Sequence, residues 1–264
     1  MHANILTIAG SDSSGGAGIQ ADLKAISATG AFGLSVITAL TAQNTLGVTS
    51  IYPVAVDFLR EQMQAVFEDV HIDAVKVGML GGPSVIEIVA EFLSSLTCPI
   101  VVDPVMVAKS GDRLLTVDAV RALKKTLIPL ASLITPNLPE AADLLAVSKA
   151  LSKDDMMKQA QNLLKLGPKS VLLKGGHLLG DESPDLLINF DTTKWFESER
   201  INTTNTHGTG CSLSSAVASF LGQGYSIGEA ILLSKRFMVG AIENADRLSV
   251  GKGHGPIHHF WNFW

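Results

Sequence analysis

The 264-residue sequence contains only two cysteines, few charged residues and no long hydrophobic run. Cys98 and Cys211 are far apart and form no CxxC pair, which indicates neither a disulfide framework nor a zinc site. No apolar run approaches the roughly 20 residues that cross a bilayer, and residues 1–4 lack the basic and apolar segments of a signal peptide. We therefore expect a cytoplasmic protein with no membrane partner.

The sequence also lacks a basic segment, and this excludes a second group of functions. The formal net charge is −5, and no stretch is rich in lysine or arginine. Such a chain is not expected to present a broad surface for nucleic acid, so local basic residues must neutralise any bound phosphate. No proline- or serine-rich linker and no internal repeat interrupts the chain. We predict a single domain over residues 1–264.

Apolar residues make up 47% of the chain, and their spacing alternates between short β-rich runs and longer runs with a helical period. This pattern predicts an α/β fold in which helices cover a mostly parallel sheet. Strands are expected over residues 4–9, 33–41, 74–77, 99–103, 132–135 and 170–174. Helices are expected over residues 17–29, 58–69, 83–95, 117–125, 140–147, 153–166 and 213–221, with one more after them. Residues 184–190 and 194–199 are expected to form a late antiparallel hairpin.

The first glycine-rich turn spans residues 10–18, between a predicted strand and a predicted helix, where backbone N–H groups can face an anion. It is not a Walker A loop, because Gly16-Ala17 stands where lysine and Ser/Thr are required. A dinucleotide fingerprint fits poorly, because no acidic residue ends the second predicted strand. The turn therefore binds an anion or simply lets the helix pack closely on the sheet.

The second glycine turn is Gly208-Thr209-Gly210-Cys211, directly before an apolar helical run. A helix N-terminus offers free backbone N–H groups and the positive end of a dipole, so this turn is a candidate anion site. The same field is expected to lower the pKa of the Cys211 thiol. A plain helix start remains the alternative interpretation.

Several long motifs resemble one family. They include TIAGSDSSGGAGIQADLK at residues 7–24 and NTHGTGC at residues 205–211, and the others lie at 38–45, 76–80, 103–106, 133–140 and 173–177. Together they make nearly the whole chain resemble the ribokinase-like superfamily, and within it the bifunctional hydroxymethylpyrimidine and phosphomethylpyrimidine kinases of thiamine biosynthesis. The resemblance implies a three-layer α/β/α ribokinase-like fold and a homodimer.

It also implies a reaction. Members phosphorylate the hydroxyl of 4-amino-5-hydroxymethyl-2-methylpyrimidine with ATP and Mg²⁺, and then phosphorylate the monophosphate to the diphosphate. Sugar kinases of the superfamily carry an aspartate as general base where this chain has Cys211. We therefore expect Cys211 to accept the hydroxymethyl proton in the first step, while the second step, whose nucleophile is already anionic, needs it less.

The resemblance assigns a substrate pocket. Gln43 matches the residue that grips the pyrimidine, and its amide can accept from an amine while donating to a ring nitrogen, as glutamine does with adenine. Without the resemblance, Gln43 is a polar residue at a strand end, and Asp22 is an exposed helix carboxylate. The residues that would contact the substrate are Gln43, Asp22, Gly10, Met79 and Val105.

The resemblance assigns a phosphate side as well. Asn137 and Glu140 have the spacing of a helix capping box, and the family adds a role in the network around Mg²⁺ and phosphate. Lys174 resembles the lysine that contacts the ATP phosphates, although a snorkelling lysine is the plain interpretation. No side chain is assigned as a direct metal ligand. The expected ATP and Mg²⁺ residues are Lys174, Asn137, Glu140, Thr206 and Lys235, beside the catalytic turn Gly208, Thr209, Gly210 and Cys211.

Two other functions remain open from the sequence. Pyridoxal kinase shares the fold, and pyridoxal also carries a hydroxymethyl group on an aromatic nitrogen ring. The chain could also be an inactive pyrimidine- or nucleotide-binding regulator. His258 and His259 could bind a metal, but we expect them to belong to a terminal packing segment.

Overall fold

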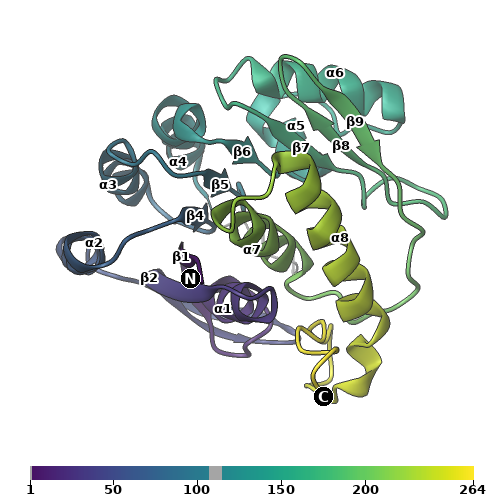
Figure 1. The fold of residues 1–264 in the computed structure, drawn as a ribbon, viewed down its shortest axis with the longest axis horizontal. Helices are drawn as coiled ribbons and strands as arrows, with labels where there is room; N and C mark the ends of the chain where they lie inside the picture. The colour runs from purple at the N-terminus through teal and green to yellow at the C-terminus, as the bar shows by residue number, and fades with distance from the viewer. Residues whose placement is uncertain (1, 107–114) are drawn as a thin grey trace.

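The computed structural model describes residues 2–106 and 115–264 (Figure 1). Its central sheet has the strand order β3-β2-β1-β4-β5-β6-β7-β8-β9 within these residues. The strands are β1 (Asn4–Asp12), β2 (Phe32–Asn44), β3 (Gly47–Pro53), β4 (Ala74–Val77), β5 (Ile100–Val102), β6 (Leu133–Ile134), β7 (Val171–Lys174), β8 (Asp185–Ile188) and β9 (Thr193–Phe196). From β2 to β7 every neighbouring pair is parallel, which confirms the predicted α/β class.

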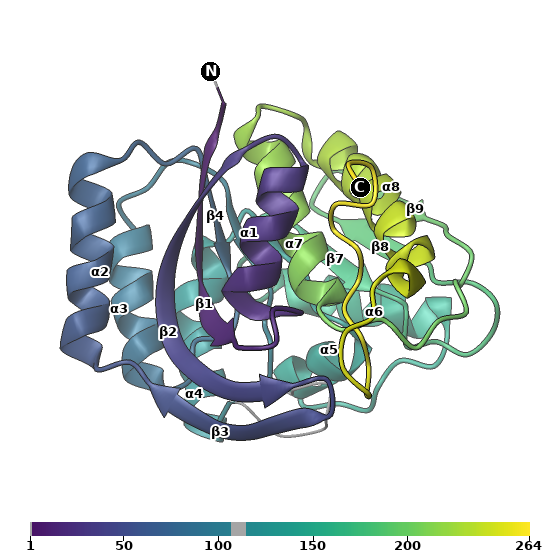
Figure 2. The same ribbon diagram turned by 90° about the horizontal axis from the view of Figure 1, so that it is seen from below.

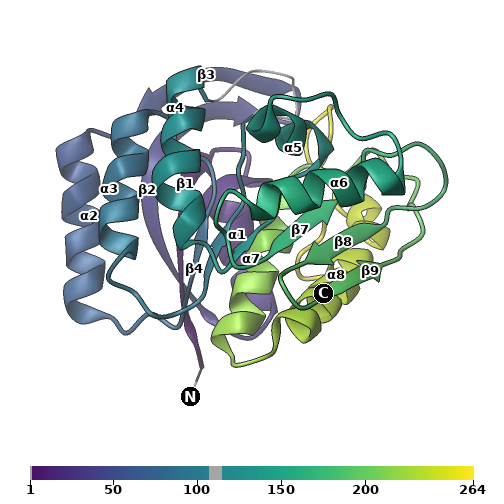
Figure 3. The same cartoon turned by 90° about the horizontal axis from the view of Figure 1, so that it is seen from above.

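Helices cover both faces of this sheet. They are α1 (Gly18–Ala28), α2 (Val56–Asp69), α3 (Pro83–Leu93), α4 (Val117–Ala122), α5 (Leu138–Leu145), α6 (Lys153–Leu164), α7 (Thr209–Gly222) and α8 (Ile227–Glu243). Short π and 3-10 turns continue α4 (Leu123–Leu127, Ile128–Leu130), and another 3-10 turn follows α8 (Ala245–Arg247). Figure 2 shows α1, α7 and α8 on one face, and Figure 3 shows α2 to α6 on the other.

The three-layer arrangement follows from period-2 alternation in the strands. Leu6 and Val75 belong to the hydrophobic core that contains α2 to α6. Their chain neighbours Ile5 and Ala74 belong to the core that contains α1, α7 and α8. Successive strand side chains point to opposite faces, so each buried strand supplies both cores. None of the helices in the described ranges is long and apolar enough to cross a bilayer.

Strand β3 was not predicted from the sequence. β2 continues to Asn44, beyond its predicted end at residue 41, and turns at Thr45 and Leu46 into β3, with which it pairs antiparallel. Every residue of β3 is at least partly exposed, and the strand ends at Pro53. An exposed edge strand that ends in proline has neither the buried run nor the clean alternation on which strand prediction depends. The hairpin extends beyond the body of the sheet (Figure 2).

The predicted late hairpin is confirmed, because β8 pairs antiparallel with β9 as well as with β7. Besides α2, which begins at Val56 rather than at residue 58, two helices begin earlier than predicted. α5 begins at Leu138, and α7 begins at Thr209 rather than at residue 213. The second shift places Cys211 inside the first turn of α7. Both helices therefore start at the carboxyl ends of the parallel strands, the edge at which open α/β sheets bind ligands.

Candidate active site

One cavity of about 1150 Å³ lies at this edge of the sheet. It is lined by all but one of the residues that the sequence assigned to the substrate, phosphate and catalytic positions. These are Gly10, Gln43, Met79, Val105, Asn137, Glu140, Lys174, Thr206, Gly208, Thr209, Gly210, Cys211 and Lys235. The sequence placed these residues on separate motifs, and the fold brings them to a single site.

The two glycine turns, which the sequence presented separately, touch each other. Gly208, the N-cap of α7, has φ +80°, and a Cβ there would lie 1.7 Å from the Gly16 carbonyl oxygen. A Cβ on Gly16 would lie 2.2 Å from Cδ2 of His207. The glycines therefore serve close backbone approach as well as turn conformation. The N-terminal end of α7 lines the cavity, and the positive end of its helix dipole favours an anion there.

Cys211 lies in the first turn of α7 and lines the cavity. The sequence predicted a lowered thiol pKa, and this prediction is wrong. Burial raises the pKa of the Cys211 thiol to about 11, although the Lys76 ammonium opposes the shift. Desolvation disfavours the thiolate more strongly than the neighbouring positive charge favours it. The thiol is therefore protonated at neutral pH in the ligand-free protein.

Lys174 ends β7 and forms an ion pair with Asp103, just beyond the end of β5, at an Nζ–Oδ1 distance of 2.9 Å. The Asp103 carboxylate is almost completely buried and also accepts from the hydroxyl of Thr135. Burial lowers the pKa of Lys174, but the charges of Asp103 and Glu140 outweigh this and raise it. A Cβ on Gly210 would lie 3.4 Å from Lys174 Nζ. Lys174 is thus a fixed cation beside the α7 N-terminus rather than a snorkelling surface lysine.

The predicted capping box at α5 is confirmed. The Asn137 side chain accepts from the Glu140 backbone N–H, and Glu140 Oε2 accepts from the Asn137 backbone N–H at 2.8 Å. Burial raises the pKa of Glu140 to about 7, although Lys174 opposes the shift. Two buried carboxylates, Asp103 and Glu140, therefore flank Lys174, and in the ligand-free protein the charge of Glu140 is poorly compensated.

Asp22 is the predicted site residue that does not line the cavity. Its carboxylate is fully buried between α1 and the sheet, where Lys76 Nζ contacts Oδ1 at 2.9 Å and Oδ2 at 2.8 Å. The hydroxyls of Thr7 and Ser215 donate to the same carboxylate. Direct contact with a substrate, as the resemblance implied, does not agree with this position, and Asp22 is not an exposed helix carboxylate either. Ser215 lies one helical turn after Cys211, so the Asp22–Lys76 pair anchors the N-terminal half of α7 to the sheet.

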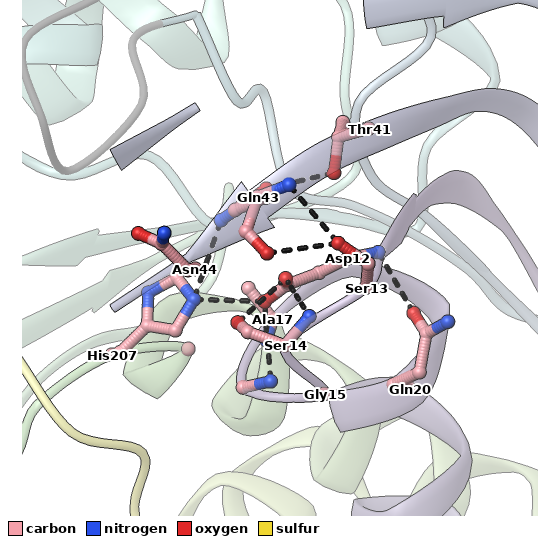
Figure 4. Close-up of polar contacts among 12 residues, drawn as sticks. Asp12, Ser13, Ser14, Gly15, Ala17, Gln20, Thr41, Gln43, Asn44 and His207 are labelled. Atoms are coloured by element: carbon pink, nitrogen blue, oxygen red, sulfur yellow. Dashed lines mark hydrogen bonds and ion pairs between the residues drawn. The ribbon is translucent and has the colours of Figure 1, made fainter. Parts of the chain in front are cut away.

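Gln43 lies near the end of β2 and faces His207 and Asp12 (Figure 4). His207 Nε2 lies 2.8 Å from Asp12 Oδ2 and 3.3 Å from Gln43 Nε2. Gln43 Oε1 lies 3.0 Å from the hydroxyl oxygen of Thr41. All four side chains line the cavity. The predicted pyrimidine-binding residue is therefore held within a network of polar side chains.

Asp12 organises the first glycine turn. Its two carboxylate oxygens accept from the backbone N–H groups of Ser14, Gly16 and Ala17 (Figure 4). Burial raises the pKa of Asp12, but hydrogen bonds from His207 and Ser14 outweigh it and lower the pKa to about 2. The turn's N–H groups are thus used by Asp12, so the first turn does not offer them to an anion. Sequence reasoning gave Asp12 and His207 no role, although both stand inside the glycine motifs.

Lys235, on α8, is paired with Asp185 at 2.6 Å, and Asp185 also accepts from the Gly175 backbone N–H. Lys235 therefore lies at the cavity wall next to the end of β7. Thr206 contributes its carbonyl, which accepts from the Thr209 side chain. The side chains of His258 and His259 are buried, in agreement with a packing segment. Among the described residues no group of three or more His, Cys, Asp or Glu is arranged to hold a metal.

A three-layer α/β/α fold in which a helix N-terminus and a largely buried lysine open on one cavity defines a ribokinase-like small-molecule kinase. The family model of phosphomethylpyrimidine kinase matches residues 12–258. The chain belongs to this family.

Similar proteins agree with this assignment. A hydroxymethylpyrimidine/phosphomethylpyrimidine kinase from Salmonella typhimurium is 51% identical, over 99% of this chain and 98% of its own. The crystal structure of phosphomethylpyrimidine kinase from Clostridium difficile 630 is 48% identical, has a TM-score of 0.81 and covers 91% of this chain and 99% of its own. Pyridoxal kinase from Staphylococcus aureus, in complex with AMP-PCP and pyridoxal, is 32% identical with a TM-score of 0.91, and the match covers 100% of this chain and 95% of that one.

Proposed function

We propose that this protein transfers phosphate from ATP to 4-amino-5-hydroxymethyl-2-methylpyrimidine and then to the resulting monophosphate, and so makes the diphosphate used in thiamine diphosphate biosynthesis. The observation that carries the proposal is the single cavity that joins the Gln43 amide to the Cys211 turn and Lys174. The names of the most similar relatives support it. Residues 1–264 act as a single kinase domain, and we expect the reaction to take place in the cytoplasm, where ATP is available.

The substrate end of the cavity is formed by Gln43, Gly10, Met79 and Val105. The Gln43 amide pairs with the amine and the adjacent ring nitrogen of the pyrimidine. A Cβ on Gly10 would lie 2.4 Å from Cε of Met79, so glycine at this position leaves room for the Met79 side chain in its present place at the cavity wall. This arrangement leaves the hydroxymethyl group directed toward Cys211.

The phosphate end is formed by the N-terminal turn of α7 together with Lys174, and Lys235 lies at its wall. Phosphoryl transfer depends chiefly on positioning and on neutralising charge, which the N–H groups of Gly208, Gly210 and Cys211 and the Lys174 ammonium supply. Mg²⁺ typically uses one or two protein carboxylates together with phosphate oxygens. Asp103 and Glu140 fit that donor set, and Asn137 holds Glu140 in place. When bound, the ion would neutralise charge on the transferred phosphate.

Replacing Glu140 with glutamine separates helix capping from the charge at the site. Glutamine preserves the capping box but removes a carboxyl that deprotonates near pH 4.5 in the unfolded chain and at about 7 in the folded protein. Between pH 4.5 and about 7 the folded protein therefore binds one more proton than the unfolded chain, so the wild type loses stability as pH rises through this range.

In urea unfolding of ligand-free protein, we expect Glu140→Gln to gain stability over wild type as pH rises from about 4.5 to 7, by on the order of 3 kcal/mol. Its kcat should fall at least about tenfold, because a carboxylate that would hold Mg²⁺ beside the phosphates is lost. A pH dependence of stability identical to that of wild type would contradict the assigned burial and charge.

Pyridoxal kinase is the competing function, since pyridoxal kinases of known structure are similar to this chain. The test compares kcat/KM for the aminopyrimidine and for pyridoxal in an assay of ADP release. We expect the aminopyrimidine to be preferred, and preference for pyridoxal would overturn the proposal. An inactive regulator would release no ADP with either compound.

We also infer a homodimer. The edge formed by β2 and β3 exposes large apolar side chains that a monomer would leave in water, among them the cross-strand neighbours Leu40 and Tyr52, and Ile51. An exposed apolar patch on an open sheet edge is typical of a protein–protein contact.

A further inference from the structure

The side chains around Gln43 determine which way its amide points. The amide nitrogen lies 3.3 Å from His207 Nε2, and the amide oxygen lies 3.0 Å from the Thr41 hydroxyl oxygen. Oxygen and nitrogen of an amide are nearly identical in size, so their positions follow from the donors and acceptors that surround them. Both neighbours can be assigned from their other contacts.

His207 is a donor at Nε2. This nitrogen lies 2.8 Å from a carboxylate oxygen of Asp12, which can only accept, and an unprotonated nitrogen would place two lone pairs against each other. Asp12 is itself held by backbone N–H groups of its turn, which keep it ionised. The Nε2 proton of His207 is therefore fixed, and an amide NH₂ beside it would be a second donor facing the first.

Thr41 is an acceptor toward Gln43. Its hydroxyl lies 2.8 Å from the carbonyl oxygen of Ser11, which can only accept, so the single hydroxyl proton goes there. An amide oxygen beside Thr41 Oγ1 would then face a lone pair. Rotating the Gln43 amide by a half turn removes this conflict and the one at His207 together. The carbonyl then lies 3.3 Å from the His207 Nε2–H and shares its proton with Asp12 in a three-centre arrangement, and the amino group donates to Thr41.

From this network we infer that His207 and Thr41 are specificity-determining positioning residues, which hold the Gln43 carbonyl toward His207 and its amino group toward Thr41. The inference rests on the proposed function, because it concerns how that pocket recognises a pyrimidine ring. His207 and Thr41 affect recognition only by orienting Gln43, which itself contacts the ring.

The network is built independently of any substrate. The His207 backbone N–H donates to the Gly255 carbonyl, and its ring packs against Gly16, where a Cβ would collide with it. His207 is 8% exposed, so water competes little for its proton. Thr41 lies on β2 two residues before Gln43, on the same side of the strand (Figure 4). Both partners are therefore in place before a ligand arrives.

Fixing the amide has a chemical consequence in the cavity. The Gln43 carbonyl, which lies on the His207 side, keeps one lone pair for the ligand. The Gln43 amino group, which lies on the Thr41 side, keeps one N–H for it. A ring with an exocyclic amine next to an unprotonated nitrogen pairs with both. The 4-oxo analogue, 5-hydroxymethyl-2-methylpyrimidin-4-one, presents C=O to the carbonyl and N–H to the amino group, so both contacts become repulsive.

The test is the ratio of kcat/KM for the aminopyrimidine to that for the 4-oxo analogue. In the wild type this ratio should exceed about 10³, because sites that hydrogen-bond a substrate reject mismatched analogues strongly. His207→Leu frees the amide to rotate, and we expect the ratio to fall at least about tenfold. His207→Gln restores an NH₂ that can donate to both Asp12 and the Gln43 carbonyl, so the ratio should stay within about threefold of wild type.

A second pair of variants tests the other side of the amide. Thr41→Val removes the acceptor at almost unchanged volume and should lower the ratio, whereas Thr41→Ser keeps the hydroxyl and should preserve it. This pair decides the question even where His207→Leu fails to fold.

The outcomes distinguish a failure of the inference about His207 and Thr41 from a failure of the proposed function. If Thr41→Val and any folded His207→Leu protein lose activity toward both compounds equally, the ratio is unchanged and the inference is overturned, since His207 and Thr41 then serve only structure. If the wild-type protein phosphorylates neither compound, the proposed function fails and the inference falls with it.

Discussion

Replacing Cys211 with alanine is expected to slow phosphoryl transfer to the hydroxymethyl group by about 10²- to 10⁴-fold, the usual contribution of a general base. Transfer to the monophosphate should be slowed much less, because that nucleophile is already anionic and has no proton to lose. The two half-reactions are measured separately, starting from the hydroxymethylpyrimidine and from its monophosphate. Equal losses in both would show that Cys211 completes the site without moving a proton.

The raised pKa of Cys211 adds a pH dependence to this prediction. Burial raises the pKa of the thiol to about 11, so only a small fraction is thiolate at neutral pH. A base that acts as the thiolate becomes more abundant as pH rises toward that value. The first half-reaction of the wild type should therefore accelerate from neutral pH toward pH about 9, and this slope should be absent in Cys211→Ala. The second half-reaction serves as the internal control.

Replacing Lys76 with methionine is expected to lower the free energy of unfolding by about 3–5 kcal/mol, the cost of leaving one partner of a buried ion pair uncompensated. Lys76 and Asp22 are both fully buried, and Asp22 accepts from Thr7 and Ser215 in addition to Lys76. The change is measured by urea unfolding at neutral pH. Activity should fall too, because Ser215 belongs to the helix that carries Cys211.

Two controls accompany this variant. The double variant Lys76→Met/Asp22→Leu removes both charges and should recover most of the lost stability, since apolar pairs often replace buried ion pairs without loss. Arg60→Met breaks the solvent-exposed pair with Glu91 and should lower the free energy of unfolding far less than Lys76→Met does. If Lys76→Met lowers the free energy of unfolding no more than Arg60→Met does, the Asp22–Lys76 pair does not stabilise the fold as described.

Much of the fold could be predicted because its parallel strands are buried on both faces. Such strands read as short apolar runs, and the runs around Val75 and Leu172 stand out clearly. β3 could not be predicted in this way, because its exposed side chains carry no burial signal. The capping box of Asn137 and Glu140 is a local pattern, and the sequence therefore predicted it correctly.

The site was predictable where its chemistry is carried by glycine turns and strand ends, and less so where it depends on tertiary neighbours. Asp22 was misplaced because nothing in its local sequence shows that Lys76, 54 positions later, neutralises it. The pKa of Cys211 was predicted in the wrong direction because burial, which the sequence does not display, outweighs the helix terminus. The Asp12–His207 contact spans 195 positions, so only folding reveals it.

The central claim is that this chain performs both phosphorylations. The most direct measurement is the number of ADP molecules released for each molecule of 4-amino-5-hydroxymethyl-2-methylpyrimidine consumed to completion with excess MgATP. We expect two ADP per substrate, with the monophosphate appearing and then disappearing. Release of a single ADP with a stable monophosphate, together with preferred turnover of pyridoxal, would contradict the account.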